Sequence, residues 1–519
     1  MQENVATLIV AAFCLAILRI SQVSLKSKKT QLPPGPKPLP IVGNMFDMPT
    51  LQPWKRYSNW HGKYACRDLL DKRSEIYSDR VPIIMDNLLG LDFNFAFMPY
   101  GQKWRASRKF FHQYFNASGS DIHIRTQVSE TRRCLLRASQ PSADIAKLTR
   151  LAVAATLVKV MYGKDVTDMN DDYIQMAAMT MEGLAKGHIP GAFWVEYLPI
   201  LRHIPSWFPG ARFKRLAETY KPYSEAVVNQ PYETILEQMA DATAPPCVAQ
   251  TMILDLRKDD VSNEDRRRQE SLFKEVLATT YAAGVDTTTA LIHVVLIAMA
   301  KFPEVQRKAQ SELDTYVGQT RLPNFGDLNN LHFIRAIIME AMRWRPIAPF
   351  GVLHRLVRED QYNGYYIPRG TNVVPNAWEI LNNSEDFPRP DQFLPERYLK
   401  DGKLDTNVCH PGDILFGFGR RYDFVGLLHD ELDVSMSIWN RVCPGRDFAE
   451  SSVFIMLASI LHAFNVEPAI GADGQPMNPD VEMSTGQLSV PESLHVAFKF
   501  RFADAENVIC ESVRYETET

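Results

Sequence analysis

The hydrophobic positions of the chain fall into long helical runs. Residues 275–302 (EVLATTYAAGVDTTTALIHVVLIAMAKF) are apolar on almost every side, which predicts a long helix through the core. Apolar residues occupy one face of 304–317 and one face of 333–345, which predicts two amphipathic helices. A second core helix is expected at 451–464 (SSVFIMLASILHAF). The pattern is that of a mainly α protein.

Turn-forming residues indicate a small β part within a single domain. Residues 363–378 mix aromatic and β-branched side chains with turn signals, which predicts short strands. No internal repeat, low-complexity run or change in composition follows residue 45. We therefore expect residues 45–519 to form one large domain, mainly α with a small β part.

The pattern differs at the N-terminus. Residues 4–23 (NVATLIVAAFCLAILRISQV) are long and apolar enough to cross a bilayer as a helix, and three lysines follow between 26 and 29. This predicts a membrane anchor at 1–25 with the rest of the chain in the cytosol, and a cleaved secretory peptide is the alternative. Residues 26–44 are basic and proline-rich, and because proline fixes φ they predict a stiff hinge.

Composition narrows the class of protein. The chain is 45% hydrophobic and 23% charged, which is typical of a globular protein. Its net charge of -4 gives no sign of the basic surface that nucleic acid would need. The seven cysteines are scattered, odd in number and without CxxC spacing. They argue against a disulfide framework or a zinc site, and for a reducing compartment.

One cysteine has unusual surroundings. Cys443 lies in VCPGRDFAESSVF, directly before the predicted helix at 451–464, and a helix N-terminus lowers the pKa of a thiol. The Pro-Gly turn after it leaves backbone amides free to bond the sulfur. Upstream, FGFGRR (416–421) offers glycines for close approach to a flat ligand and arginines for carboxylates. A purely structural cysteine is the alternative.

A charged pair lies on the predicted helix at 333–345. Glu340 and Arg343 are three residues apart and share a face, so they can form an ion pair. Arg397 in FLPERY is a possible third member. Burying such a set is costly unless each member is satisfied, and it would then fix the geometry near a ligand. The alternative is a surface pair that contributes little.

Polar residues interrupt the apolar helix at 282–290 (AAGVDTTTA). Gly284, Asp286 and Thr287 are unfavourable there because glycine weakens a helix and buried polar groups need partners. A local opening of the helix beside a ligand would use them, with the acid and the alcohol relaying protons. The alternative is a polar kink satisfied by neighbouring backbone.

A donor pair occurs near residue 105. Trp104 and Arg108 in GQKWRASRKFF are four residues apart, hence on one helical face. The indole and the guanidinium only donate hydrogen bonds, so together they suit a propionate carboxylate. A solvated basic helix face is the alternative.

Taken together, these residues make the chain resemble a microsomal cytochrome P450. The likeness runs from the N-terminal segment and LPPGPKPLPIVGN (32–44) to near residue 500, in the order of that family. It looks closest to fungal P450s of secondary metabolism and xenobiotic oxidation, as in 189–215 (IPGAFWVEYLPILRHIPSWFPGARFKR). The resemblance implies the P450 fold, preceded by a transmembrane helix, with haem b between the 275–302 helix and the 443–464 segment.

The resemblance also implies roles for residues that match the family's motifs. Cys443 would be the axial ligand of the haem iron. Asp286 and Thr287 would supply protons during O₂ activation. Glu340, Arg343 and Arg397 would form a structural triad. The haem contacts would come from Trp104, Arg108, His354 and an arginine for which Arg421 and Arg441 both match. Substrate would lie against Ala282, Ala283 and residues 347–352.

The activity that this implies is monooxygenation of a hydrophobic small molecule, with O₂ and electrons from NADPH through a membrane-bound P450 reductase. The location would be the endoplasmic reticulum membrane, single-pass, with the catalytic domain facing the cytosol. A non-catalytic product of an altered transcript that binds haem poorly is one alternative. A haem-thiolate isomerase or dehydratase that needs no O₂ is another, disfavoured by the pair Asp286 and Thr287.

The chain departs from the family at residues 422–441. In the family the loop runs without a break from GRR to VCPG, whereas here twenty residues intervene. They can be read as a translated intron: Arg-Tyr-Asp can be encoded by AGG-TAT-GAC, which contains the donor-like string GTATGA. Removal of 60 nucleotides (20 × 3) restores GRRVCPGR in frame. We therefore expect a gene-model artefact at this place.

A second departure lies near residues 64–65, in WHGKYACRDLLDKRS (60–74). The family carries a pair of strands between WHGKY and the RDLL helix, and here the pair is missing. Because strands average five or six residues, a whole hairpin is absent and its neighbours would be left as open edges. A misplaced splice boundary would explain this too.

Overall fold

The computed structural model describes residues 31–35, 51–57, 65–115, 121–141, 143–189, 191–258, 262–418 and 442–518. The predicted anchor, the interrupting segment 422–441 and most of the predicted hinge lie outside these residues. Within them the structure is mainly helical with a few small sheets, as the hydrophobic pattern predicts.

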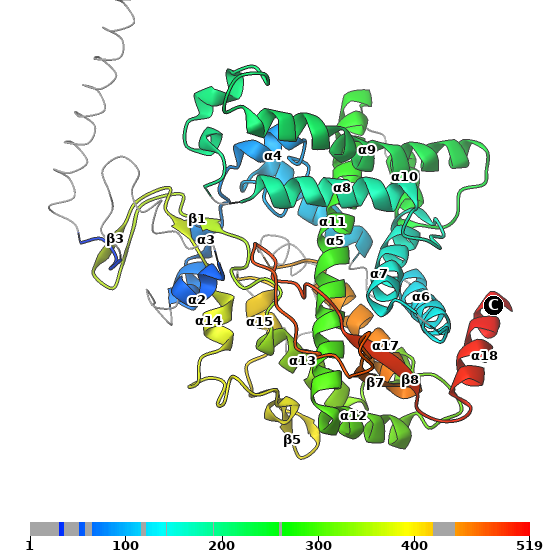
Figure 1. The fold of residues 1–519 in the computed structure, drawn as a ribbon. Coiled ribbons are helices and arrows are strands. Elements are labelled where there is room, and N and C mark those ends of the chain that lie inside the picture. The colour runs from blue at the N-terminus through cyan, green and yellow to red at the C-terminus, as the bar shows by residue number, and fades with distance from the viewer. Residues whose placement is uncertain are drawn as a thin grey trace, which may run out of the picture.

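Helices make up most of the described chain (Figure 1). The first half contains α2 Pro53–Tyr57, the π-helix η3 Arg67–Lys72, α3 Ser74–Tyr77, α4 Ile84–Leu89, α5 Gln102–Phe115, α6 Asp121–Ala138, α7 Ile145–Tyr162, α8 Asp172–Gly187, η4 Trp194–Glu196, η5 Pro199–His203, α9 Arg212–Ala240 and α10 Val248–Lys258. The second half contains α11 Asn263–Lys301, α12 Pro303–Tyr316, η6 Phe325–Asp327, α13 His332–Trp344, α14 Ala377–Leu381, η7 Pro395–Tyr398, α15 Gly412–Leu415, α17 Arg446–Ala463 and α18 Ala505–Glu518.

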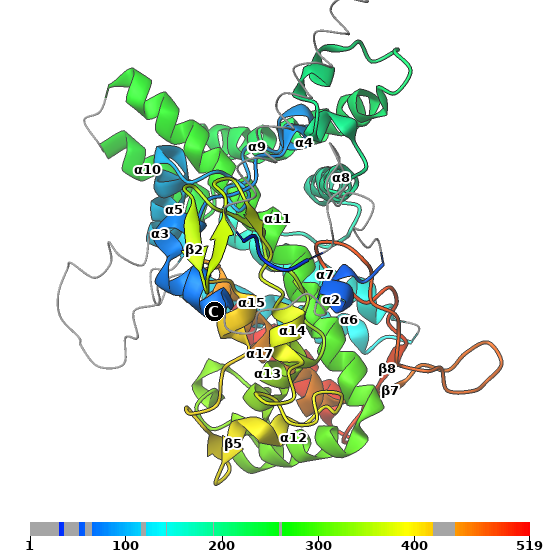
Figure 2. The ribbon, with the colours of Figure 1, turned by 90° about the vertical axis from the view of Figure 1, so that its left-hand side faces the viewer.

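The described strands form four antiparallel pairs at the edge of the helical body (Figure 2). They are β1 His354–Arg355 with β4 Asn372–Val373, β2 Asp360–Tyr362 with β3 Tyr365–Ile367, β5 Leu399–Lys400 with β6 Lys403–Leu404, and β7 Phe464–Pro468 with β8 Val496–Phe500. The small strands predicted at 363–378 are confirmed by β3 and β4, and β7 continues directly from α17.

The core is built around α11. This helix has 39 residues, so it is roughly 58 Å long, and it runs through the centre of the molecule (Figure 1). It packs against α5, α7, α13 and α17. Among the described residues it is the helix long and apolar enough to cross a membrane, but most of its apolar stretch is buried in protein. It is therefore the core helix of this domain.

The predicted helices are present, with shifted boundaries. The expected helix at 275–302 begins twelve residues earlier, because the Ser262 side chain caps it by accepting from the Asp265 amide. The polar stretch at its start (NEDRRRQES) hides this boundary from an apolar pattern. The helix predicted at 451–464 likewise begins at Arg446. Cys443 therefore lies three residues before a helix, closer than its sequence suggested.

The predicted opening of the helix at 282–290 is wrong: α11 is a continuous α-helix there. Gly284 allows close packing instead, since a Cβ at that position would come within 2.7 Å of Leu157 Cδ1 on α7. The Thr287 hydroxyl donates to the carbonyl of Ala283 at 2.7 Å, so the backbone of the previous turn satisfies it.

The chain around the missing strand pair is helical where it is described. Between residues 65 and 115 the described chain has no strand, only an isolated bridge between Asp79 and Arg355. Side chains hold the β2–β3 hairpin there: Arg73 pairs with Asp360 at 2.6 Å, and the Tyr362 hydroxyl donates to Asp68 at 2.8 Å. These contacts come from η3 and the residue after it. Side chains of a helical segment therefore hold the two-stranded hairpin formed by β2 and β3.

Candidate active site

Three helices bring the predicted chemical residues into one assembly. Cys443 precedes α17, Trp104 and Arg108 lie on α5, and α11 carries Asp286 and Thr287. Because α11 packs against both α5 and α17, the two predicted sides of a haem site adjoin the same central helix.

The two flanks of the interrupted loop meet. The Cys443 amide donates to the carbonyl of Phe416 at 2.7 Å, and the Arg446 guanidinium lies 5.4 Å from the centre of the Phe416 ring. Gly417 has φ of +94°, a backbone conformation that favours glycine, and it turns the chain at this point. The described residues on either side of the interruption, Phe416 and Cys443, are thus in direct contact.

Opposing effects act on the pKa of the Cys443 thiol. Burial raises the pKa of this thiol, while a hydrogen bond from the Gly445 amide and the positive charges of Arg108 and Arg446 act to lower it. The net pKa stays above its ordinary value. A cysteine with an amide donor and two nearby cations is suited to binding a cationic metal centre, since the thiolate is the ligand form.

A buried arginine, Arg108, lies close to this sulfur. Arg108 donates to the carbonyl of Val442 at 2.9 Å and stands over the Trp104 ring at 5.9 Å. Burial lowers the pKa of Arg108 to about 10, and within the described residues Arg108 pairs with no carboxylate. It therefore remains charged at neutral pH, and the part of the chain that the structure describes gives this group of five donors one hydrogen bond.

Arg80 is the second buried arginine, and sequence reasoning missed it. It donates to the carbonyls of Ala96, Val352 and Leu353 at 2.9–3.1 Å. Burial lowers the pKa of Arg80 to about 9, Asp79 opposes this, and the charge of Arg108 lowers it further. Two neighbouring buried cations fit an anionic group such as the haem propionates. Two of its three carbonyl partners lie more than 250 residues away, so the local sequence does not mark Arg80 as buried.

Glu340, Arg343 and Arg397 form one closed network. Arg343 holds both oxygens of Glu340 at 2.8 and 2.9 Å, and Arg397 donates to Glu340 at 3.0 Å. Glu340 and Arg343 are both 0% exposed, so the surface-pair alternative is wrong. The remaining donors reach backbone carbonyls, and the Leu394 amide donates to Glu340 at 2.9 Å. The network fastens α13 to the segment at 388–398.

Asp286 points toward α7. Its carboxylate pairs with Arg150 at 2.6 Å, and it borders a small cavity of about 10 Å³ with Tyr281 and Val285. That volume admits about one water molecule. Thr287 lies one position further along α11 and bonds back to Ala283. The structure thus gives the acid and the alcohol separate partners.

The structure places two of the other predicted haem contacts, Trp104 and His354, in separate elements. Trp104 is buried on α5 and packs on Tyr100 at 5.2 Å. His354 is buried in β1, where its Nδ1 bonds the Tyr77 carbonyl at 2.7 Å. Arg421 and Arg441 lie outside the described residues, so the choice between them stays open.

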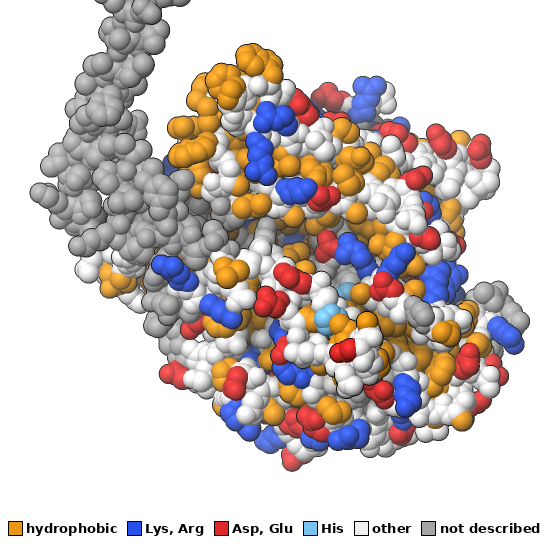
Figure 3. Space-filling view, viewed as in Figure 1, with side chains coloured by type: hydrophobic (Ala, Val, Ile, Leu, Met, Phe, Trp, Pro, Cys, Tyr) orange, Lys and Arg blue, Asp and Glu red, His pale blue; other side chains and the backbone are white. Residues whose placement is uncertain are grey.

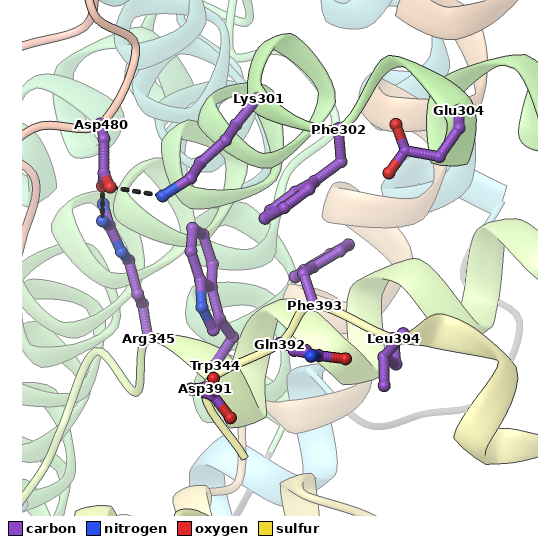
Figure 4. A pocket seen from close by; sticks show the side chains of 10 residues that line it. All are labelled: Lys301, Phe302, Glu304, Trp344, Arg345, Asp391, Gln392, Phe393, Leu394 and Asp480. Carbon is purple, nitrogen blue, oxygen red and sulfur yellow. Dashed lines mark hydrogen bonds and ion pairs between the residues drawn. The ribbon is translucent and has the colours of Figure 1, made fainter. Parts of the chain in front are cut away.

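A larger hollow lies elsewhere in the molecule. It has about 520 Å³ and is lined by Lys301, Phe302, Trp344, Phe393 and Asp480 among others (Figure 4). The close-up shows Lys301 and Arg345 reaching Asp480. This hollow is at the C-terminal end of α11, fifteen residues beyond Asp286 and therefore about 22 Å along the helix. It is distinct from the site near Cys443.

Comparisons with known proteins agree with the geometry. The chain is 34% identical to the cytochrome P450 monooxygenase COX2 of Coprinopsis cinerea, over 90% of this chain and 89% of that protein. It is 33% identical to a tryptamine 4-monooxygenase of Psilocybe cyanescens, over 94% and 95%. It is 34% identical to the cytochrome P450 monooxygenase ple1 of Rhodocybe pseudopiperita, over 94% and 92%.

A family model points the same way. The model described as cytochrome P450 matches residues 33–422, about three quarters of the chain. Its match ends at the first residue of the interrupting segment, Tyr422. Together with relatives that align over nearly the whole length, this shows that the chain is a member of the cytochrome P450 family and a P450 monooxygenase.

Proposed function

We propose that this P450 hydroxylates a hydrophobic small molecule, a secondary metabolite or a xenobiotic, with O₂ and with electrons from NADPH through a P450 reductase. The observation that carries the proposal is the Cys443 thiol, placed before α17 with the Gly445 amide and the Arg108 cation beside it. Haem b, held through its iron by this sulfur, would supply the activation of O₂.

The residues around Cys443 would hold the cofactor by complementary charge. Arg108 and Arg80 are buried cations that fit the propionates, and the Trp104 indole is a further donor on the same helix face. His354 and either Arg421 or Arg441 would complete the contacts. The network of Glu340 would hold α13 and the 388–398 segment in place beneath them.

Asp286 and Thr287 would move protons. Asp286 pairs with Arg150 in a cavity that admits one water, so its carboxylate is held by a cation and adjoins a place for a proton carrier. The Thr287 hydroxyl can change its acceptor from the Ala283 carbonyl at little cost. Such a pair suits O₂ chemistry and disfavours the isomerase or dehydratase alternative.

An apolar surface supports membrane association. Exposed large hydrophobic residues gather between α8 and α9, with Ile200 72% and Trp207 78% exposed, together with Trp194, Tyr197 and Phe208 (Figure 3). Contiguous exposed apolar patches mark interaction sites. We place the protein on the endoplasmic reticulum membrane, with this surface and the 4–23 segment toward the lipid.

Brominated lipids test this placement, because they should quench the fluorescence of Trp194 and Trp207 in the full chain. If quenching is the same in the double variant Trp194→Leu and Trp207→Leu, the placement is contradicted.

The decisive test is optical. Reduced membranes that contain the expressed chain should, on addition of CO, show the absorption band of thiolate-ligated haem. Absence of this band, with protein present by immunoblot, would contradict the proposal and favour the non-catalytic product of an altered transcript. Sequencing the mature message tests the intron hypothesis separately, because a message that retains the codons for 422–441 rules it out.

Turnover then identifies the substrate. One relative is named for the oxidation of tryptamine, so indole amines belong in a substrate panel beside terpenoids and simple aromatics. Co-expressed reductase and NADPH should be needed for product. Turnover that proceeds without NADPH would instead support the isomerase or dehydratase alternative.

A further inference from the structure

A buried histidine–aspartate pair joins two helices far from Cys443 in sequence. His188 follows α8, and its Nε2 lies 2.5 Å from Asp86 Oδ1 on α4. The His188 side chain is 6% exposed and that of Asp86 is 12% exposed. Such a pair is costly to bury unless further bonds satisfy it, so its neighbours decide what it can do.

Two further elements contact the imidazole. His188 Nδ1 lies 3.3 Å from the Gln487 side-chain oxygen, which comes from the loop before β8. The Phe97 ring meets the imidazole edge-on at 5.0 Å. The His188 side chain therefore contacts three elements: α4, the segment after α4 that contains Phe97, and the loop before β8. The His188 backbone lies at the C-terminal end of α8.

The N-terminus of α4, next to Asp86, is held by a second contact. Glu196 in η4 accepts the amides of Ile84 and Met85 at 2.9 and 2.8 Å, which caps a short helix that has no other side-chain cap. Gly187 allows α8 to approach, because a Cβ there would come within 2.5 Å of Leu89 Cδ1. The packing leaves His188 and Asp86 no space to separate without moving α4.

The C-terminal loop leads from this pair to the expected substrate region. The Ser489 amide donates to the Ile347 carbonyl at 2.8 Å, and Ile347 opens the 347–352 segment against which substrate is expected. Arg80 holds the other end of that segment through the Val352 carbonyl. Gln487 and Ser489 are two residues apart, so a displacement of the loop at His188 reaches Ile347.

We propose that His188 and Asp86 form a proton-controlled latch that positions α4 and the 484–490 loop around the substrate region. The protonated imidazole ties the two elements together through Asp86 and Gln487. Loss of the proton removes the ion pair with Asp86 and leaves the ring a single N–H, so the oxygens of Asp86 and Gln487 can no longer both accept from it, and both elements loosen. His188 and Asp86 are thus positioning residues that act through the loop and α4.

The direction of the pH effect follows from the groups that face His188. From α4 it meets the carboxylate of Asp86, from η4 the charge of Glu196, and from the loop the neutral Gln487. Burial lowers the pKa of His188, but the bond to Asp86 and the charge of Glu196 outweigh it and leave the pKa above its ordinary value. The latch is therefore closed below that pKa and opens as pH rises through it.

Hydrogen exchange of the full chain tests the latch without any substrate. After correction for intrinsic rates, amides in 84–91 and 484–490 should exchange about tenfold faster at pH 9 than at pH 6, as expected when a charge-assisted bond is lost. Amides of α17 serve as the internal reference and should keep their protection. Equal corrected exchange at both pH values in these two segments overturns the proposal.

Variants assign the effect to the pair. His188→Gln and Asp86→Asn should each show the fast exchange at both pH values, and the double variant should be no faster than either. His203→Gln, at an exposed histidine of η5, is the matched control and should keep the wild-type pH dependence. A pH dependence that survives in His188→Gln also contradicts the latch.

The consequence for ligands rests on the proposed function. Phenylimidazole, followed by its effect on the haem spectrum, should bind and leave severalfold faster at high pH in the wild type and at every pH in the variants. If hydrogen exchange depends on pH but the protein binds no haem, the latch is supported and the proposed function is not. If the protein binds haem but hydrogen exchange does not depend on pH, the proposed function is supported and the latch is contradicted.

Discussion

Buried arginines lie near both Glu340 and Cys443, and the two places differ in how those charges are satisfied. Around Glu340, two guanidinium groups and a backbone amide fill the carboxylate, and the remaining arginine donors reach carbonyls of 381–392. Around Cys443, the described residues give the Arg108 guanidinium one hydrogen bond, to the Val442 carbonyl, and they give Arg80 carbonyl partners alone. Among the described residues, the charges around Glu340 are balanced by protein groups, whereas Arg108 near Cys443 has no carboxylate partner.

That difference separates scaffold from binding site. A buried network that satisfies itself gains nothing from an added ligand, and removing one member leaves an uncompensated charge. A buried cation such as Arg108, for which the described residues supply no carboxylate, is costly unless an anionic group joins it, so its burial indicates a ligand. Variants of the first set should therefore change stability, and variants of the second should change cofactor binding.

The largest effect is expected for Cys443→Ser. Serine lacks a thiolate, so the CO band of reduced, thiolate-ligated haem should disappear entirely while the fold is kept. Cys409→Ser is the matched control, because Cys409 is only partly buried and lies near His410. Difference spectra of membranes with equal amounts of protein make the measurement. A CO band of normal position in Cys443→Ser would remove the assignment of this residue as ligand.

Glu340→Gln should have the next largest effect, on stability. It removes the negative charge between two arginines that are held in place by carbonyls, so unfolding free energy should fall by about 3–5 kcal/mol. Urea unfolding followed by circular dichroism measures this, with an unchanged slope taken as the sign of the same fold.

Glu396→Gln supplies the contrast for that measurement. Glu396 pairs with Lys308 on the surface, where both side chains are half-exposed, and the loss should stay below about 1 kcal/mol. Equal losses in the two variants would mean that burial of the Glu340 network contributes nothing special.

Sequence alone identified most members of both sets. Three-residue spacing on a periodic helix was enough to pair Glu340 with Arg343, because helix geometry fixes which side chains meet. Cys443 stood out because local chain chemistry, a Pro-Gly turn before a helix, surrounds it. The segment FLPERY offered Arg397 as a possible third member, and the resemblance to P450s supplied His354; the partners of both lie far along the chain.

Long-range contacts account for what the sequence could not show. Arg80 gains its importance from carbonyls about 272 residues later, and no local pattern marks it. The predicted helix opening at Asp286 was wrong because Arg150, from another helix, already satisfies the acid. A polar group in an apolar helix predicts that a partner exists, and only the tertiary structure shows whether that partner is a ligand, a backbone group or another helix.

Arg108→Gln should weaken cofactor binding without unfolding the protein. One charge-assisted contact to a propionate is lost, so haem should dissociate about tenfold more readily. Transfer of haem to apomyoglobin gives the rate. Lys109→Gln, an exposed neighbour on α5, should match the wild type. Unchanged haem transfer from Arg108→Gln would mean that the spare charge near Cys443 does not serve the cofactor.

The smallest effect should come from Arg446→Gln. This variant compares a cation that is paired within the protein with Arg108, for which the described residues supply no carboxylate. Arg446 also favours the Cys443 thiolate, but Glu450 and Asp413 already neutralise it at 2.8 and 3.0 Å. Its removal should therefore raise the pKa of the Cys443 thiol less than removal of Arg108 does.

In haem-free protein, alkylation of Cys443 at neutral pH should slow by less than about threefold in Arg446→Gln and by more in Arg108→Gln. Mass spectrometry of the peptide that contains Cys443 reads both rates. The reverse order would show that a cation paired within the protein acts on the sulfur as strongly as an unpaired one, and the contrast with the Glu340 network would then lose its physical basis.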